Sequence, residues 1–184
     1  MTDTVLDPNP GRRRFLAETL LKFINNKLSI ADLDGIPPKK MQQVAELGYV
    51  KLKHGRLKEA REIFEMLSEL DHLNAYYRTA LGSIFQKQGQ YVDAIVEYSQ
   101  ALFLRPKDLP SLVNRGEILL RTENFKKAAE DFRSAILMDN KGTNLWANRA
   151  RSLVIALKRN LDLKKAALVP KQVPPSRSAT RRPR

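Results

Sequence analysis

A period of 34 residues constrains this chain more than any other feature of its sequence. Gly48, Gly82 and Gly116 are separated by that interval. Four other series repeat with the same spacing: Leu57, Tyr91 and Phe125; Ala60, Ala94 and Ala128; Phe64, Tyr98 and Phe132; and Leu67, Ala101 and Ala135. Self-similarity at a fixed period of this length is typical of proteins built from stacked copies of one small unit. The sequence therefore predicts three consecutive copies of such a unit.

Each copy is predicted to hold two helices that pack closely. A glycine in the middle of a helix costs about 1 kcal/mol relative to alanine. The repeated Gly48, Gly82 and Gly116 therefore indicate positions where another helix comes near. The aromatic residue that follows each repeated alanine by four positions shares its helix face. These aromatic residues are predicted to fill the space between neighbouring helices: Phe64, Tyr98 and Phe132.

Short turns are predicted between the two helices of each copy. Gly55 and Gly89 suit the left-handed backbone conformation that follows many helices. In the third copy Asn124 is expected to take that conformation, because asparagine tolerates it better than most residues. The residues expected to cap the first helix of each following unit are Asn74, Asp108 and Thr143.

The repeats and their flanks divide the chain into seven parts. The two ends are predicted to be disordered, because proline and charge leave them too little apolar surface to bury. Between them, a helical extension carries an apolar face and precedes the copies, and a last helix shields the third copy from water. In chain order the parts are residues 1–11 (disordered), 12–40 (extension, with Phe15, Leu16, Leu20, Phe23 and Ile24 on the apolar face), 41–74, 75–108 and 109–142 (copies), 143–165 (capping helix) and 166–184 (disordered basic tail).

The second copy carries the most typical set of repeat residues: Leu81, Gly82, Phe85, Tyr91, Ala94, Tyr98, Ala101 and Pro106. With this pattern the chain resembles the tetratricopeptide repeat (TPR). The first copy departs from the pattern at Lys51 and His72, and the third has Asn140 in place of the proline. The resemblance implies an all-α fold: three TPR helix-turn-helix repeats in a right-handed superhelix, with an N-terminal amphipathic helix and a C-terminal capping helix.

A longer series of residues, from Leu28 to about Leu157, is similar to a narrower family, the class II chaperones of bacterial type III secretion. It includes the lead-in 28–37, Leu70-Asp71-His72 at the end of the first repeat, and Gly89-Gln90-Tyr91 in the second. This resemblance implies a protein of the bacterial cytoplasm that binds an extended segment of a hydrophobic translocator and keeps it soluble until export. It also implies that two copies often associate through their N-terminal regions.

The expected client-binding residues follow from the TPR arrangement, in which the first helix of each repeat lines the concave face. Apolar side chains there would form pockets, and polar ones would bind an extended backbone. The alternative, a solvated inner face without a client, stays open. The predicted residues are Gln42, Ala45, Glu46, Tyr49, Leu52 and Lys53 in the first repeat, Tyr76, Thr79, Ala80, Ser83, Gln86 and Lys87 in the second, and Val113, Asn114, Glu117, Leu120 and Arg121 in the third.

Composition and motifs argue against an enzyme. The chain has no cysteine, and its two histidines, His54 and His72, stand in separate turn regions, so no metal site is predicted. No phosphate-binding or nucleophile motif is present, and no cofactor is expected. Glu130 and Asp131 are interpreted as surface carboxylates and Trp146 as a core residue. No apolar run approaches the roughly 20 residues that span a membrane.

The charge of the chain is concentrated in its last part. Residues 156–184 contain nine Lys or Arg and one Asp, a net charge of +8 out of +13 for the whole chain. Such a tail could neutralise phosphates, but no aromatic residue follows Trp146 to stack on bases. Nucleic acid is therefore considered an unlikely partner. Two further functions stay open: a TPR adaptor that scaffolds an assembly without chaperone activity, and a nucleic-acid-associated TPR protein that acts through the tail.

Overall fold

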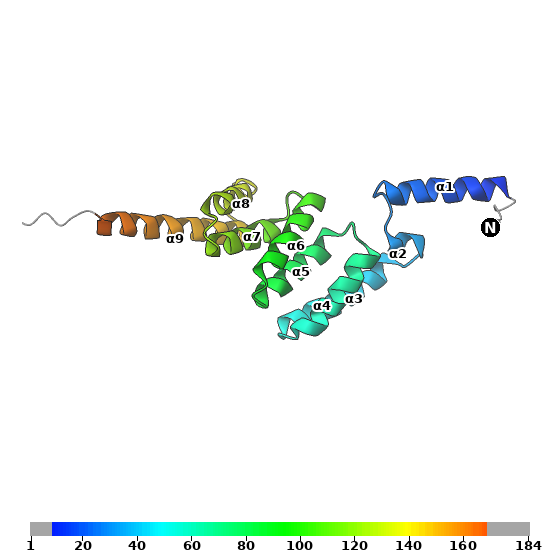
Figure 1. Ribbon diagram of the computed structural model, residues 1–184, viewed down its shortest axis with the longest axis horizontal. Coiled ribbons are helices and arrows are strands. Elements are labelled where there is room, and N and C mark those ends of the chain that lie inside the picture. The colour runs from blue at the N-terminus through cyan, green and yellow to red at the C-terminus, as the bar shows by residue number, and fades with distance from the viewer. Residues whose placement is uncertain (1–8, 169–184) are drawn as a thin grey trace, which may run out of the picture.

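The computed structural model of the protein describes residues 9–168, and every regular element in this part is an α-helix. Figure 1 shows three consecutive pairs, α3 with α4, α5 with α6 and α7 with α8, followed by the long α9. The predicted all-α fold is confirmed. The helices are α1 (Pro10–Ile24), α2 (Ile30–Leu33), α3 (Pro38–Lys53), α4 (Leu57–Leu70), α5 (Ala75–Lys87), α6 (Tyr91–Leu104), α7 (Leu109–Arg121), α8 (Phe125–Leu137) and α9 (Leu145–Leu168).

The repeated glycines lie where the two helices of a pair meet. A Cβ atom built on Gly82 would lie 2.7 Å from the Tyr98 ring, and one on Gly116 would lie 2.7 Å from the Phe132 ring. At Gly48 the distance to the Phe64 ring would be 2.9 Å. These three rings are fully buried. The close helix approach predicted from the period is confirmed in all three pairs.

Buried side chains form two clusters along the stack. One gathers residues of α2 to α7 around Phe64 and Tyr98. The other joins residues of α6, α7, α8 and α9 around Phe132 and Ala150. Because each cluster is shared between neighbouring pairs, each repeat depends on the next for the burial of its apolar face.

The turns and caps follow the predicted pattern with two corrections. Gly55 and Gly89 take positive φ values of 75° and 77°, as predicted, but in the third turn the residue with positive φ is Glu123 rather than Asn124. Asn74 and Asp108 cap α5 and α7. The residue that caps α9 is Asn144, not Thr143. Its Oδ1 accepts hydrogen bonds from the backbone N–H groups of residues 146 and 147 at 2.9 and 3.3 Å.

Several helices begin or end away from the predicted limits. Pro10 and Gly11, predicted to be disordered, form the first turn of α1, with Asn9 as its cap. The helix α3 begins at Pro38 rather than at residue 41, because a proline is well placed in a first turn. The helix α9 continues to Leu168, past the predicted end at residue 165. Most of the predicted disordered tail, residues 169–184, lies outside the described residues, as do residues 1–8.

Arg115 links three helices of the second and third repeats through an ion pair and a hydrogen bond. Arg115 on α7 donates to both carboxylate oxygens of Asp131 on α8, at 2.9 and 2.7 Å. Its third nitrogen donates to Ser99 Oγ on α6 at 2.9 Å. Asp131 is buried, so the interpretation of this residue as a surface carboxylate is wrong. Glu130, its neighbour, is exposed as expected.

The helix α1 stands apart from the stack (Figure 1). It has no buried residue. At its end, the Phe23 ring meets the His72 ring edge-on at a centroid distance of 5.9 Å, and His72 Nε2 lies 3.2 Å from Asn26 Oδ1. Among the described helices, none combines the length and apolar character that crossing a membrane requires.

Candidate client-binding groove

Two hollows lie along the helices that begin the repeats. The first, the N-terminal pocket, has a volume of about 410 Å³. Its walls are Ser29, Ala31, Asp32, Ile36, Pro38, Met41, Gln42, Ala45, Glu46, Asp71, Asn74, Tyr76 and Tyr77. The second, the C-terminal cleft, has a volume of about 880 Å³. Its walls are Ser83, Gln86, Lys87, Tyr91, Asn114, Glu117, Ile118, Leu120, Arg121, Trp146, Arg149 and Leu153.

The helix α5 joins the two hollows. Tyr76 lies in the N-terminal pocket, and Ser83 and Lys87 lie in the C-terminal cleft. These residues are seven and eleven positions apart, so they share one face of α5. We call the two hollows, together with this face of α5, the groove.

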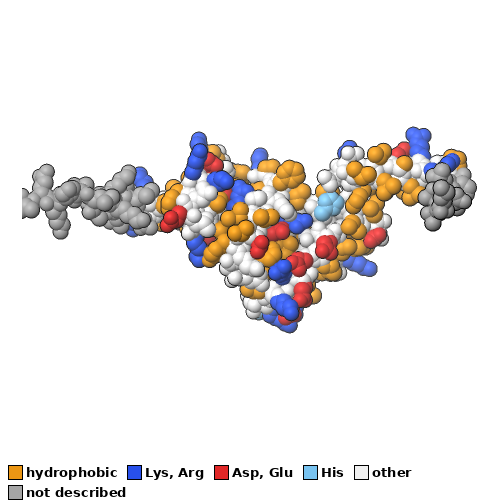
Figure 2. All heavy atoms as spheres, viewed as in Figure 1, with side chains coloured by type: hydrophobic (Ala, Val, Ile, Leu, Met, Phe, Trp, Pro, Cys, Tyr) orange, Lys and Arg blue, Asp and Glu red, His pale blue; other side chains and the backbone are white. Residues whose placement is uncertain are grey.

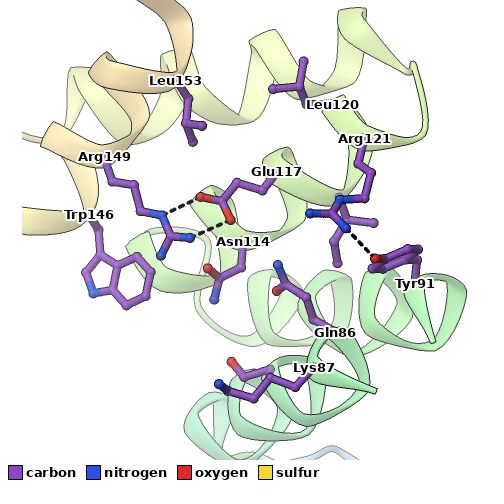
Figure 3. A pocket seen from close by; sticks show the side chains of 12 residues that line it. Gln86, Lys87, Tyr91, Asn114, Glu117, Leu120, Arg121, Trp146, Arg149 and Leu153 are labelled. Atoms are coloured by element: carbon purple, nitrogen blue, oxygen red, sulfur yellow. Dashed lines mark hydrogen bonds and ion pairs between the residues drawn. The ribbon is translucent and has the colours of Figure 1, made fainter. Parts of the chain in front are cut away.

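The C-terminal cleft is bounded by charged and aromatic side chains (Figure 3). Arg149 on α9 pairs with Glu117 on α7 through two contacts, Nε to Oε1 at 2.5 Å and Nη2 to Oε2 at 2.8 Å. Arg121 donates to the Tyr91 hydroxyl at 2.8 Å and stacks over that ring at 5.5 Å. Lys87 lies on the opposite side of the cleft from Arg149 (Figure 3). Polar walls of this kind, next to Leu120, Trp146 and Leu153, can bind a peptide backbone and its apolar side chains together.

A buried hydroxyl supports the floor of the cleft. Tyr98 on α6 is fully buried, and its hydroxyl donates to Gln86 Oε1 at 2.8 Å and lies 3.2 Å from Ser83 Oγ. Burial raises the pKa of Tyr98 to about 12. The hydroxyl therefore stays protonated at neutral pH and holds Gln86 in a fixed position.

The N-terminal pocket is made by α2, α3 and the start of α5. Ser29 and Asp32 form a capping box that fixes α2, and these hydrogen bonds hold the pKa of Asp32 below its usual value. The Tyr76 ring meets the Phe64 ring edge-on at a centroid distance of 6.0 Å. Burial raises the pKa of the Tyr76 hydroxyl, and the nearby Tyr49 and Glu46 raise it further.

The structure separates the predicted client-binding residues into three groups. Eleven of the seventeen line one of the hollows: Gln42, Ala45, Glu46 and Tyr76 in the N-terminal pocket, and Ser83, Gln86, Lys87, Asn114, Glu117, Leu120 and Arg121 in the C-terminal cleft. Tyr49 and Lys53 are exposed on α3 outside both hollows. The other four are buried and line neither hollow: Leu52, Thr79, Ala80 and Val113.

These four buried residues have structural partners of their own. Leu52 and Ala80 belong to the first core cluster, and Val113, which is fully buried, belongs to the second. The Thr79 hydroxyl lies within 2.9 to 3.1 Å of Ala75 O, Ser111 Oγ and Asp108 Oδ2, and so joins α5 to α7. These four side chains are buried where the helices pack on each other, so their predicted contact with a client stays a prediction.

Sequence reasoning missed the part of the cleft that α9 and α6 supply. Trp146, predicted to be core, is half-buried and packs against the second core cluster, and it also lines the cleft with Arg149 above its ring at 5.8 Å. By the 34-residue period, Trp146, Arg149 and Leu153 correspond to Leu112, Arg115 and Leu119, which pack toward α8. In the described part no second helix follows α9, so its equivalent residues are free to line the cleft. That incomplete fourth unit was the signal available in the sequence.

Comparisons with known proteins place this architecture among repeat proteins. The sequence pattern of the tetratricopeptide repeat matches residues 45–108 and 79–144. The chaperone protein SicA of Salmonella dublin is 27% identical over 139 residues, which are 76% of this chain and 82% of SicA. The resemblance to type III secretion chaperones is thereby confirmed.

Solved structures of type III secretion proteins have the same fold. A type III secretion complex from Aeromonas hydrophila superposes with a TM-score of 0.71 and 26% identity, covering 79% of this chain and 99% of that one. PcrH, a protein of Pseudomonas aeruginosa, has been solved with the chaperone binding region of PopD. In that complex it superposes with a TM-score of 0.63 and 25% identity, covering 70% of this chain and 98% of PcrH. With the period, the paired helices and the matched sequence pattern in agreement, the chain belongs to the tetratricopeptide repeat family.

Proposed function

We propose that this chain is a chaperone of bacterial type III secretion that binds an extended segment of a hydrophobic translocator and keeps it soluble in the cytoplasm. The observation that carries the proposal is the groove, in which eleven predicted residues from three helices line two adjoining hollows. PcrH, which shares this fold over 98% of its length, is solved with the chaperone binding region of PopD. A similar segment of a translocator is therefore the occupant that we assign to this groove.

The proposed mechanism is stoichiometric binding rather than catalysis. Apolar side chains of the client would enter beside Tyr76 in the N-terminal pocket and beside Trp146 and Leu153 in the cleft. Amide and hydroxyl groups such as Gln86 and Ser83 would bind the extended backbone. Shielding of apolar client surface from water would keep the client from aggregating until export.

The exposed apolar side of α1 supports the predicted contact between two copies of the chain. Phe15 is 66% exposed and Ile24 is 70% exposed. Figure 2 shows hydrophobic side chains along this helix. We propose that a second copy of the chain covers this side of α1 in a homodimer, because a helix with an apolar face gains stability by burying it against a partner.

Co-expression tests the proposed function directly. A hydrophobic translocator from the same type III secretion system is expected to accumulate in the insoluble fraction alone and in the soluble fraction, bound to this chain, when both are produced. A Ser83→Trp variant, which places a large ring inside the cleft, should lose this effect. A translocator that stays insoluble in both cases would contradict the proposal, and soluble partners bound without any change in solubility would favour an adaptor.

A further inference from the structure

We infer that the groove is electrostatically polarised and selects a client segment with a basic side chain for the N-terminal pocket and an acidic side chain for the C-terminal cleft. This inference rests on the proposed function, because it describes the segment which that function requires. Complementary charges decide which partners bind and in which register more than they add to affinity.

The N-terminal pocket is lined by three carboxylates and no Lys or Arg. Asp32 accepts hydrogen bonds from the backbone and hydroxyl of Ser29, and Asp71 accepts from the backbone N–H of Leu73. Glu46 accepts from the Gln42 amide at 3.1 Å. These donors are neutral, and none of the three carboxylates forms an ion pair with a described residue. The pocket therefore keeps its negative charge and favours a cation.

The C-terminal cleft has the opposite sign. Its charged residues are Lys87, Arg121, Arg149 and Glu117. Because Glu117 is paired with Arg149 on two contacts, that pair is neutral as a unit. Lys87 and Arg121 pair with no carboxylate of the described chain, and the polar partner of Arg121 is the neutral Tyr91 hydroxyl. Two uncompensated cations remain, and they favour a carboxylate.

The helix α5 sets the approximate distance between the two hollows. Tyr76 and Lys87 are eleven residues apart on α5, which at 1.5 Å per residue is about 16 Å. An extended segment advances about 3.3 Å per residue, so about five residues separate the basic and the acidic side chain of the client. Ser83, a small residue on this face between Tyr76 and Lys87, lines the end of the C-terminal cleft that is nearer to Tyr76 along α5.

Selection from a random peptide library tests this inference. The full-length chain is exposed to displayed peptides of about twelve residues, long enough to span both hollows at about 3.3 Å per residue. Enriched peptides are expected to carry one basic and one acidic side chain, about five residues apart and in one constant order. Enriched peptides without a shared charge order would overturn the inference and leave the proposed function intact.

Reversing one charge in each hollow identifies which hollow binds the basic and which binds the acidic side chain of the peptide. For an enriched peptide, Glu46→Lys is expected to weaken binding about threefold to fivefold, and replacing the peptide's basic residue with glutamate should restore it. Glu62→Lys, on an exposed position of α4 outside both hollows, is the matched control. Arg121→Glu should weaken binding of the peptide by a similar factor, because the acidic residue of the peptide would then face a carboxylate. Lys127→Glu on α8 is the matched control. Equal effects of each variant and its control would overturn the inference.

The same selection separates failure of this inference from failure of the proposed function. Peptides enriched on the unmodified chain should not be enriched on the Ser83→Trp variant, whose cleft is filled. If the two chains enrich the same peptides, the groove is not the binding site and the proposed function fails as well.

Discussion

A single missing side-chain atom sets the distance between the two helices of each repeat. At Gly82 a Cβ would lie 2.7 Å from the ring of Tyr98, closer than carbon atoms pack. Glycine in a helix costs about 1 kcal/mol. The cost is offset because the absent atom lets a large aromatic ring be buried between the helices.

Gly82→Ala is expected to lower the free energy of unfolding by about 1 to 2 kcal/mol. Forcing an extra carbon into a packed site costs about 1 to 3 kcal/mol, and the better helix propensity of alanine recovers part of it. Chemical denaturation measures the change. In a Tyr98→Leu background the same substitution should cost less, because the opposing ring is gone; an equal cost would contradict the account of this contact.

Tyr98 makes the stability of the fold sensitive to high pH. Its pKa is about 12 in the folded chain, against 10.0 for a tyrosine in water, the value expected once the chain unfolds. The folded state holds the hydroxyl proton of Tyr98 more tightly than the unfolded state, and the stabilisation of the fold that results is complete below pH 10. As the pH rises toward 12 this stabilisation is lost, and the free energy of unfolding falls by about 1.4 kcal/mol per pH unit. The free energy of unfolding should fall over this interval by more in the unmodified chain than in Tyr98→Phe. Parallel pH curves for the two chains would be the contrary result.

At the scale of the element, the pairing of helices could be predicted and their ends could not. The period located Gly55 and Gly89 at their turns because glycine adopts those backbone angles at the lowest cost. Glu123 takes the same conformation in the third turn, and Asn124, with a φ of −84°, is the residue that directly precedes α8. Likewise Asn144 rather than Thr143 caps α9, and the Asp139 carboxylate accepts from the backbone N–H groups of both residues, at 3.2 Å from Thr143 and 3.1 Å from Asn144.

The groove was predictable only in part for the same physical reason. Position in the repeat shows which way a helix face turns, and it correctly placed Gln86, Glu117 and Arg121 in the cleft. It does not show how near the next helix lies. Val113 and Ala80, which were expected on the concave side, are buried, whereas Trp146 is only half-buried and lines the cleft, where no partner helix follows α9 in the described part.

The contact between α7 and α8 is predicted to depend on one buried carboxylate. Asp131→Asn should lower the free energy of unfolding by about 2 kcal/mol, because Arg115 loses a charged partner on two hydrogen bonds. Glu130→Gln, at the adjacent exposed position, should change stability by less than about 0.5 kcal/mol. Thermal or chemical unfolding of the two variants compares them, and equal losses would show that the ion pair does not stabilise the third repeat.

At the scale of the whole molecule, the stacked repeats have a buried core, whereas α1 is exposed to solvent. The repeats bury their apolar faces on each other, but α1 exposes Leu20 and Leu21 at 56% and 57%. The helix α1 has no buried residue, so it adds no buried side chain to the core of the repeats. Its apolar side therefore indicates an interaction outside a single chain.

Leu20→Asp is expected to convert a dimer of this chain into a monomer, because a carboxylate cannot be buried unpaired at an apolar contact. Light scattering during size-exclusion chromatography measures the mass. Lys22→Asp, on the polar side of α1, should leave the dimer intact. A monomeric unmodified chain, or a Leu20→Asp variant that stays dimeric, would contradict the role assigned to α1.

The central claim is that the groove binds an extended segment of another protein. The fluorescence of one residue tests it. The chain has one tryptophan, Trp146, and it lines the C-terminal cleft beside Arg149. Titration with a tryptophan-free chaperone-binding segment of a translocator should change the emission of Trp146 saturably, with one segment bound per chain. A segment that binds by an independent measurement, such as calorimetry, and leaves the emission of Trp146 unchanged would contradict the account.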